Sequence, residues 1–356
     1  MRVERFDYEL PPERIAQAPA AEREAARMLV VSPAGLVHRA VADLAEHVAP
    51  GTLVVVNDTK VLRARILGAK AGSGGKSEVF LVRKIDGDAR AQRWRALGRA
   101  SKGLRPGTRV VKGALAIEVT GKADDGLFEV ELTTLDGASV DEAIRAAGQV
   151  PLPPYIKREP GADDEARYQT VFARAEGAVA APTAGLHLTA ALMERLRERG
   201  CEIATCTLHV GLGTFQPVMV DDLDDHPMHA EAIEVPEALV SAIARARSRG
   251  APVLAIGTTV VRALESARDP ERPGHVRACA EDTRLLIQPG YVFGVVDRLL
   301  TNFHLPKSTL LALVCAFAGE ERTLSAYRAA IHEAYRFYSY GDAMLIDRAP
   351  PAGAHG

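Results

Sequence analysis

The sequence predicts an α/β fold, a mixed and largely parallel sheet domain that is interrupted by an inserted small β-barrel domain. Residues 61–150 form short β-like runs separated by turns that contain Gly, Asp or Pro, a pattern typical of a small barrel or sandwich. After the proline-rich joint PLPPYIKREPG (151–161), helix and strand patterns alternate. Because TLVVVNDTK (52–60) is a further strand, the α/β pattern begins before the β segment and resumes after it. We therefore expect one discontinuous α/β domain, 1–60 and 151–356, with 61–150 inserted as a basic β-barrel domain.

The inserted segment contains GSGGKS (72–77), which looks like a phosphate-binding loop. Such a loop needs a glycine five residues before its Gly-Lys-Ser, and Lys70 occupies that position. It must also open a helix, whereas a strand pattern follows. We therefore interpret GSGGKS as a hairpin turn. The expected strands are ARILGAK (64–70), SEVFLVRK (77–84), RWRALGRA (93–100), TRVVKG (108–113), LAIEVT (115–120) and LFEVELT (127–133).

Helices of the second half carry start and stop signals, a polar cap or proline at the start and a glycine at the end. The expected order is a helix from Thr189 to Gly200, the strand IATCTL (203–208), a helix from Pro236 to Gly250, the strand PVLAIG (252–257), a helix from Thr258, the strand GVVDRLLTNF (294–303), and a helix from Ser308 or Thr309 to Gly319. A last amphipathic helix starts at Thr323, and its core face consists of Leu324, Tyr327, Ile331, Ala334 and Tyr338.

The composition is that of an ordinary globular protein, with 47% hydrophobic and 25% charged residues. The first ten residues, MRVERFDYEL, carry charges where a secretory signal needs an apolar core, and the longest apolar run, 310–318, is too short to cross a bilayer. We expect a cytoplasmic monomer that does not associate with membranes. The four cysteines form no Cys-x-x-Cys pair and are expected to be reduced thiols.

Positive charge is concentrated in one segment. The net charge is −2, but residues 63–112 hold fourteen Arg and Lys against three acidic residues, a balance of +11 that leaves −13 elsewhere. Such a basic island is the electrostatic footprint expected for a polyanion. The alternative is a solubilising charged face on a small β domain.

Polar residues gather at predicted strand ends, where ligands bind in α/β sheets. Three histidines and several glycines occur there, and glycines let backbone approach a ligand. We hypothesise a shared cleft, although turns and helix caps would explain each group separately. The groups are Asn57, Asp58 and Thr59; His209, Gly211, Gly213 and Thr214; Gly257, Thr258 and Thr259; Asn302, His304 and Lys307; and, in the turn APTAGLH, Thr183, Gly185 and His187.

Several chemistries lack their motifs. The sequence has no Gly-x-Gly-x-x-Gly, no Gly-x-Ser-x-Gly and no His-Glu-x-x-His, which disfavours hydride transfer, serine hydrolysis and zinc hydrolysis. His226 and His229 lie among aspartates that could hold a cation, but a solvated loop explains this pattern more simply, and no metal is expected. Group transfer or isomerisation by acid and base groups remains.

A set of stretches spread over residues 6–346 resembles the S-adenosylmethionine:tRNA ribosyltransferase-isomerase family of bacterial queuosine synthesis. Leu188, Gln216 and Ala230 depart from the family pattern, where phenylalanine, arginine and serine are usual, and Gln216 lacks the positive charge of that arginine. The stretches are FDYELPPERIAQAP, VVNDTKVLRAR, GGKSEVFLV, LPPYIKRE, RYQTVFA, GAVAAPTAGLHLT, TLHVGLGTFQPV, HPMHAE, AIGTTVVRALES, GYVFGVVDRLLTNFHLPKSTLLALVCAFAG and YRFYSYGDAMLI.

The resemblance implies an α/β domain interrupted by a β-barrel, and an enzyme that moves the ribosyl part of S-adenosylmethionine onto 7-aminomethyl-7-deazaguanine at the first anticodon position of tRNA. The ribose is rearranged to an epoxycyclopentane, which gives epoxyqueuosine and releases adenine and methionine. S-adenosylmethionine is a consumed donor, and no cofactor is needed.

Residue roles are expected on this basis. We expect acid or base groups at His187, His209 and His304, assisted by Glu231 or Asp58, and methionine carboxylate binding at Gly257, Thr258 and Thr259. Further substrate contacts are expected at Asn57, Thr59, Thr183, Gly185, Gly211, Gly213, Asn302 and Lys307, and tRNA contacts at Lys76, Arg93, Arg95, Arg99 and Lys102. The alternatives are a non-catalytic tRNA-binding protein and an S-adenosylmethionine-dependent methyltransferase.

Overall fold

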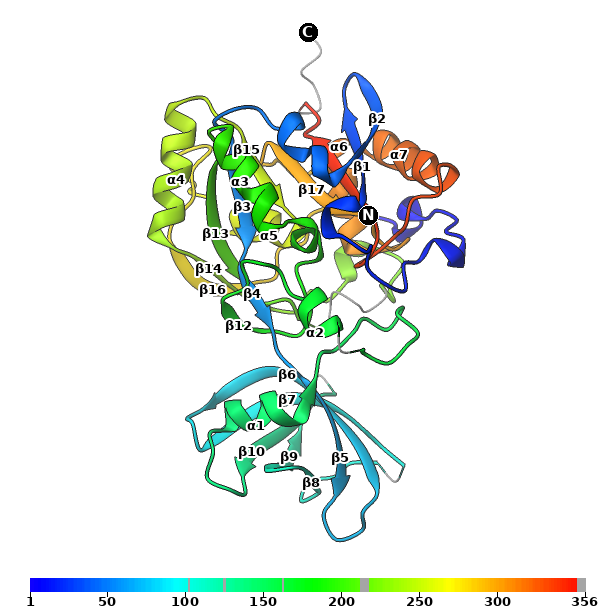
Figure 1. The fold of residues 1–356 in the computed structure, drawn as a ribbon, viewed down its shortest axis with the longest axis vertical. Coiled ribbons are helices and arrows are strands. Elements are labelled where there is room, and N and C mark those ends of the chain that lie inside the picture. The colour runs from blue at the N-terminus through cyan, green and yellow to red at the C-terminus, as the bar shows by residue number, and fades with distance from the viewer. Residues whose placement is uncertain (102, 124–125, 162, 212–217, 351–356) are drawn as a thin grey trace.

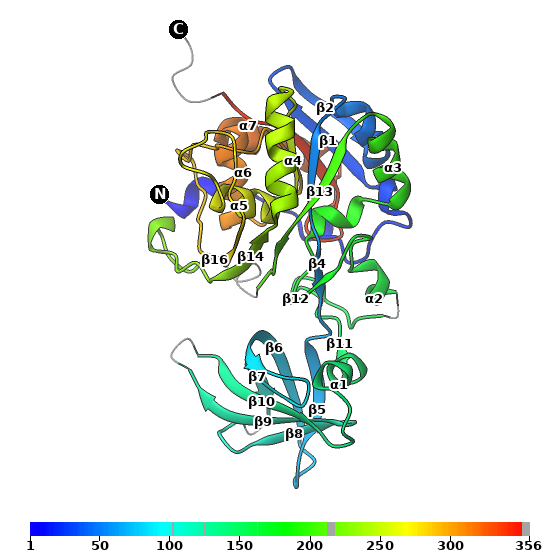
Figure 2. The same cartoon turned by 90° about the vertical axis from the view of Figure 1, so that its left-hand side faces the viewer.

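A computed structural model describes residues 1–101, 103–123, 126–161, 163–211 and 218–350. The chain forms a larger α/β part and a smaller barrel, placed one after the other along the long axis (Figure 1). The two parts are joined where β4 (Thr59–Val61) and β12 (Ala175–Ala178) pair as a short parallel ribbon. Figure 2 shows the same separation from the side.

The α/β part is built on a nine-stranded mixed sheet in the order β16-β14-β13-β3-β15-β17-β18-β1-β2. The four central strands, β13, β3, β15 and β17, are mutually parallel, and antiparallel pairs flank them. This confirms the predicted mixed α/β class. The strands are β1 (Arg27–Ser32), β2 (Gly35–Ala40), β3 (Leu53–Asn57), β13 (Glu202–Leu208), β14 (Glu231–Val235), β15 (Val253–Ile256), β16 (Cys279–Thr283), β17 (Arg298–Asn302) and β18 (Ala343–Asp347).

Central strand β3 shows why this sheet folds as it does. All five of its residues are buried, as expected for a parallel strand covered on both faces. Leu53 and Val55 join the core formed with α4, α5, α6 and α7, while Val54 and Val56 face α3 and the short helix η4. The alternation of one strand thus divides the core into two layers.

Helices begin and end largely at the predicted signals. Thr189 Oγ1 accepts a hydrogen bond from Leu192 N, and Ser308 Oγ accepts one from Leu311 N, so both residues cap helices. The helices are α2 (Asp164–Arg167), α3 (Ala190–Glu198), α4 (Glu237–Ser248), α5 (Thr258–Ser266), α6 (Thr309–Ala318) and α7 (Glu320–His332), with the 3-10 turns η1 (Val3–Phe6), η2 (Pro12–Arg14), η3 (Arg23–Ala25), η4 (Val41–His47), η5 (Thr183–His187) and η7 (Leu223–Asp225).

The prediction for the last helix was wrong at both ends. Helix α7 starts at Glu320, directly after Gly319, and its first turn carries two glutamates that favour an N-terminus. It ends at His332, because Ala334, two residues later, adopts the left-handed conformation with a φ of 59°. Tyr338 therefore lies outside the helix, where its own φ is 71°.

The barrel is a closed, six-stranded antiparallel sheet in the order β5-β6-β7-β10-β9-β8, which closes where Ala69 pairs with Val111 and Lys70 with Val110. GSGGKS is the predicted hairpin turn, in which Gly72 and Gly74 take φ of 82° and 67°. The strands are β5 (Arg65–Lys70), β6 (Lys76–Gly87), β7 (Ala91–Ala100), β8 (Arg109–Lys112), β9 (Leu115–Lys122) and β10 (Phe128–Thr134); β11 (Gly148–Gln149) pairs with β5.

One helix of the barrel was not expected. Helix α1 (Val140–Ala147) starts with a capping box, in which Ser139 and Glu142 bond each other's backbone. Its buried Val140, Ala143 and Ile144 belong to the barrel core. The division of the chain at 60/61 and 150/151 stays a prediction, although the barrel strands lie between these positions.

Within the described residues, no helix is both long and apolar enough to span a membrane. All four cysteines are free thiols.

Candidate active site

The carboxyl ends of the four parallel strands lie along one edge of the sheet, and a pocket opens there over β15 and β17. This β15/β17 pocket encloses about 680 Å³, the open solvent at its mouth included. Six of the predicted site residues line it, namely Thr183, Gly257, Thr258, Thr259, Asn302 and His304. Its other polar or aromatic residues are Tyr155, Thr301, Phe303, Ser308, Tyr338 and Ser339.

The start of helix α5 forms one wall of the pocket. Gly257 is the N-cap, with a φ of 98° that favours glycine. The first N–H groups of a helix have no intrahelical acceptor and carry partial positive charge. Thr259 Oγ1 is buried there without a hydrogen-bond partner among the described residues. This wall can therefore bind a carboxylate.

Asn302 ends β17 and reaches into the same pocket. Its Nδ2 lies 3.1 Å from both His187 Nε2 and the Tyr338 carbonyl oxygen, which accept hydrogen bonds from it. Its Oδ1 is buried and, within the described part of the chain, unpartnered. A buried, unsatisfied amide oxygen is costly, so a ligand that donates to this atom would stabilise the site.

His187 lies behind Asn302 and does not line the pocket. Burial lowers the pKa of its imidazole to about 4, although the negative charge of Asp342 acts in the opposite direction. With Nε2 accepting from Asn302, the neutral ring carries its proton on Nδ1. The geometry makes His187 a support that orients Asn302.

His304 lines the pocket directly. Its Nε2 lies 2.8 Å from Thr301 Oγ1, and its backbone N–H donates to the hydroxyl of Tyr327. Burial lowers the pKa of this imidazole to about 3. The ring is therefore neutral at physiological pH.

Aromatic rings supply a further wall. The rings of Tyr155 and Tyr338 lie 4.7 Å apart, and the hydroxyl of Tyr155 is hydrogen-bonded to Ser339 at 2.5 Å. Burial raises the pKa of Tyr155 to about 12, so it stays protonated. Sequence reasoning did not identify these residues as site residues. Their occurrence in LPPYIKRE and YRFYSYG, two of the family-like stretches, was the available signal.

The electrostatics of the pocket are unusual for a polar site. Of the described residues, no Asp, Glu, Lys or Arg lines it, and its histidine is neutral. Aromatic rings and uncharged polar groups suit a ligand that brings its own positive charge.

The polar residues at the ends of β3 and β13 form a second cluster next to the β4/β12 ribbon. Both polar atoms of Asn57 are used within the chain, by Leu208 and by Thr59 N. The buried Asp58 accepts from Thr207 Oγ1 at 2.6 Å and from Arg174 at 2.8 Å. This cluster braces the point at which the chain leaves the sheet for the barrel.

His209 belongs to this second cluster. Its Nδ1 lies 2.8 Å from Thr59 Oγ1, and its ring packs so closely on Gly177 that a Cβ there would come within 2.7 Å. Burial lowers the pKa of His209. The structure thus does not bring the three histidines into one cleft, although Val210, the next residue, lines the β15/β17 pocket.

Glu231 forms a third polar group. It is ion-paired with the buried Arg262, and its Oε1 accepts from Gly211 N at 2.9 Å. Glu231 and Arg262 border a neighbouring pocket that shares Leu310 with the β15/β17 pocket. Arg262 Nη2 is buried and has no partner within the described residues.

The remaining predicted residues have structural settings. A Cβ on Gly185 would meet Thr170 at 2.9 Å, so tight packing requires glycine there. Lys307 is ion-paired with Asp7 at 2.9 Å and its N–H bonds Phe6 O, which ties down the amino-terminal segment. Gly213, Thr214 and Gln216 lie outside the described residues. Leu188 is fully buried in the core, and Ala230 is half-buried.

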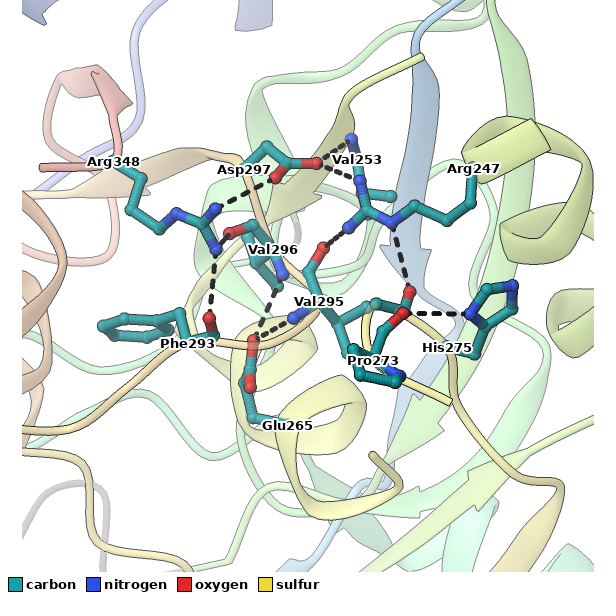
Figure 3. A network of polar contacts seen from close by, with 11 residues as sticks. Arg247, Val253, Glu265, Pro273, His275, Phe293, Val295, Val296, Asp297 and Arg348 are labelled. Atoms are coloured by element: carbon teal, nitrogen blue, oxygen red, sulfur yellow. Dashed lines mark hydrogen bonds and ion pairs between the residues drawn. The ribbon is translucent and has the colours of Figure 1, made fainter. Parts of the chain in front are cut away.

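A polar network fixes the start of β17 and so positions Asn302 and His304 (Figure 3). The buried carboxylate of Glu265, on α5, accepts hydrogen bonds from the N–H groups of Gly294, Val295 and Val296 at 2.9–3.1 Å. Asp297 is in turn paired with Arg247 at 2.6 Å. Helix α5 and strand β17, the two walls of the pocket, are thereby locked to each other.

The basic island is partly neutralised in the folded barrel. Arg93, Arg95 and Arg99 point outward from β7, because the alternate residues are buried. However, Arg93 is paired with Asp86, and Arg95 lies 3.2 Å from Glu129 on the adjacent β10. Residues 61–150 as a whole hold sixteen Lys and Arg against eleven Asp and Glu. The balance of the barrel is therefore +5.

Arg99 and Lys76 are exposed on the barrel surface. Lys102 lies outside the described residues. The predicted contacts of these residues with tRNA stay predictions. Among the described residues, no group of three or more His, Cys, Asp or Glu side chains is arranged to hold a metal ion. That the chain uses no metal stays a prediction.

Comparisons with known proteins identify relatives over nearly the whole chain. A family model described as "Queuosine biosynthesis protein" matches residues 3–346. The S-adenosylmethionine:tRNA ribosyltransferase-isomerase from Sorangium cellulosum is 60% identical, over 97% of this chain and 98% of the relative. The protein of the same name from Paraburkholderia phytofirmans is 53% identical, over 96% of this chain and 97% of the relative.

A solved structure supports the same relationship. The crystal structure of S-adenosylmethionine tRNA ribosyltransferase from Thermotoga maritima is 33% identical, with a TM-score of 0.54, and covers 96% of this chain and 99% of its own. With the family model, the high identities and the shared fold in agreement, the chain belongs to the S-adenosylmethionine:tRNA ribosyltransferase-isomerase family of queuosine biosynthesis.

Proposed function

We propose that this chain transfers and isomerises the ribosyl moiety of S-adenosylmethionine onto 7-aminomethyl-7-deazaguanine at the first anticodon position of tRNA. The products are epoxyqueuosine in the tRNA, adenine and methionine. S-adenosylmethionine is a consumed donor, no cofactor takes part, and the enzyme works as a cytoplasmic monomer. The observation that carries the proposal is the β15/β17 pocket in a chain of this family.

The charges of the donor match the groups that line the pocket. Its carboxylate binds the free N–H groups at the start of α5, next to Thr258 and Thr259. Its sulfonium cation lies against the rings of Tyr155 and Tyr338, since a cation is attracted to an aromatic face. A neutral His304 does not repel that cation.

Proton transfer centres on His304. The sulfonium acidifies the neighbouring ribose hydrogen, so a positioned base can remove it. Departure of adenine needs a proton in return. Because burial lowers the pKa of the His304 imidazole to about 3, the protonated ring is a strong acid that would return the proton readily to the departing base. The neutral ring is a correspondingly weak base, so the adjacent sulfonium must supply much of the acidity of the ribose hydrogen. Asn302, held by His187, orients the ribose through Oδ1.

The other predicted catalytic residues are His209, Asp58 and Glu231. We propose that they support catalysis indirectly, His209 and Asp58 by holding the second cluster in place and Glu231 through its ion pair with Arg262. Thr59, Asn57, Gly211 and Lys307 likewise support the fold of the site. The amine of the tRNA base is the nucleophile, so the reaction needs no nucleophile from the protein. The barrel is proposed to contact the tRNA through its outward arginines.

Free adenine is the diagnostic product. We expect the purified chain, given S-adenosylmethionine and tRNA that carries the aminomethyl base, to release adenine and methionine in equal amounts. His304→Ala should lower kcat by at least about 100-fold, the usual contribution of an acid–base group. His332→Ala, which removes a side chain that is 86% exposed, is the matched control. Near-normal turnover of His304→Ala would contradict the assignment, and S-adenosylhomocysteine as the product would indicate a methyltransferase instead.

A further inference from the structure

Three arginines converge on a second, smaller pocket beside the β15/β17 pocket. This arginine pocket encloses about 290 Å³ including open solvent, and Arg23, Arg167 and Arg336 line it together with His187 and Ser339. Ser339 borders both pockets, and His187 is hydrogen-bonded to Asn302 of the other one. The two pockets are therefore separated by one layer of side chains.

The positive charge of the arginine pocket is poorly compensated. Among the described residues, neither Arg23 nor Arg167 lies within ion-pair distance of a carboxylate. Arg23 donates to the carbonyl oxygens of Leu186, Ala166 and Gln169 at 2.8–2.9 Å. Arg167 donates only to Ala20 O and Ala21 O.

Two carboxylates that adjoin lining residues of the pocket, Asp342 next to Gly341 and Asp164 bonded to Tyr340, are engaged elsewhere. Asp342 accepts from the backbone N–H groups of Arg27 and Arg336 and lies 3.6 Å from the Arg336 guanidinium. Asp164 is held by Arg158 in a two-pronged ion pair and by the hydroxyl of Tyr340. Neither carboxylate neutralises Arg23 or Arg167.

Free donors remain in the pocket. A guanidinium has five N–H groups, of which Arg23 uses three and Arg167 two in the hydrogen bonds above. Arg167 Nε is buried and, in the described chain, unpartnered. Burial and the neighbouring charge of Arg167 both lower the pKa of Arg23, as expected for two cations that face each other without an anion.

We propose that the arginine pocket binds a phosphate group of the RNA backbone next to the modified base, a step that rests on the proposed function. Arginine forks match the oxygens of phosphate, and charge-assisted hydrogen bonds are the strong ones. A base that enters the β15/β17 pocket must leave its stack, and its own phosphate then lies a few bonds away. Anchoring that phosphate one side-chain layer from Asn302 would hold the aminomethyl group toward the donor.

The test uses RNA hairpins that carry the aminomethyl base and, in each, one loop phosphate replaced by a neutral methylphosphonate. With the wild-type chain, one linkage beside the modified base should weaken RNA binding about tenfold and raise KM for RNA equally, while KM for S-adenosylmethionine stays unchanged. If no linkage has such an effect, the proposal is overturned. Because binding is measured as well as adenine release, this result is separate from a failure of the proposed function.

Variants assign the contact to the pocket. In Arg167→Gln the penalty for that linkage should disappear, whereas Arg197→Gln, which removes an exposed charge on α3, should keep it in full. Arg336→Gln provides the same comparison should Arg167→Gln fold poorly, because the side-chain polar contacts of Arg336 are long, at 3.5–3.6 Å. A penalty that persists in both pocket variants would place the phosphate elsewhere. Inhibition by inorganic phosphate without any methylphosphonate effect would show a site for free phosphate and overturn the RNA assignment.

Discussion

Replacing His187 by glutamine should change how the stability of this enzyme depends on pH. Glutamine offers an amide in place of the ring nitrogen bonded to Asn302, but it does not titrate. In the folded chain burial lowers the pKa of His187 from 6.5 to about 4. The folded state therefore resists protonation where the unfolded state accepts it.

The sign and size follow from this difference. A depressed folded pKa gives stability that is fully present above pH 6.5 and is lost as the pH falls toward about 4. Each pH unit in this window costs about 1.4 kcal/mol. Going from about pH 7.5 to about pH 5 should thus remove about 2 kcal/mol of unfolding free energy through His187 alone. His304, with a pKa of about 3, acts in the same direction.

Urea unfolding at both pH values measures the effect. Far-ultraviolet circular dichroism is the suitable signal, because the helices are mostly in the α/β part, whereas the single tryptophan, Trp94, lies on barrel strand β7. Wild type should lose about 2 kcal/mol more than His187→Gln between the two conditions. The exposed His332→Gln should behave as wild type. Equal losses in wild type and His187→Gln would refute the view of His187 as a neutral, buried support.

Three further predictions concern the pocket walls and the barrel. Glu265→Ala leaves three buried N–H groups without their acceptor and should cost at least about 3 kcal/mol in unfolding free energy; an unchanged melting temperature would contradict this. Gly257→Ala should cost about 1–2 kcal/mol because of its φ of 98° and raise KM for S-adenosylmethionine but not for RNA; equal changes in both constants would argue against a carboxylate site at α5. Reversing the charges of Arg93, Arg95 and Arg99 together should weaken tRNA binding and flatten its salt dependence in a titration; unchanged binding would confine RNA contacts to the α/β part.

Much of the site was predictable because it follows from strand order. Parallel strands end at the same edge, so the polar residues after β15 and β17 had to lie near each other. The Gly-Thr-Thr turn, Asn302 and His304 indeed share one pocket. The sequence does not show that β3 and β13 end toward the barrel ribbon, which is why Asp58 and His209 lie in a separate cluster.

What could not be predicted depends on tertiary packing. Tyr338 fits the helical spacing of the preceding residues, and only the left-handed backbone at Ala334 ends the helix and sends this ring into the pocket. Similarly, a count of charges along the chain does not show which charged residues lie opposite each other on paired strands. Arg95 looked free in the sequence, but barrel pairing places Glu129 directly opposite it.

A crystal structure with S-adenosylmethionine bound would test the central claim most directly. We predict electron density in the β15/β17 pocket, with the carboxylate at the N–H groups of Thr258 and Thr259 and the sulfonium against Tyr155 and Tyr338. Density for the donor in the pocket beside Glu231 and Arg262, or at the second cluster beside His209, with the β15/β17 pocket empty, would contradict the account.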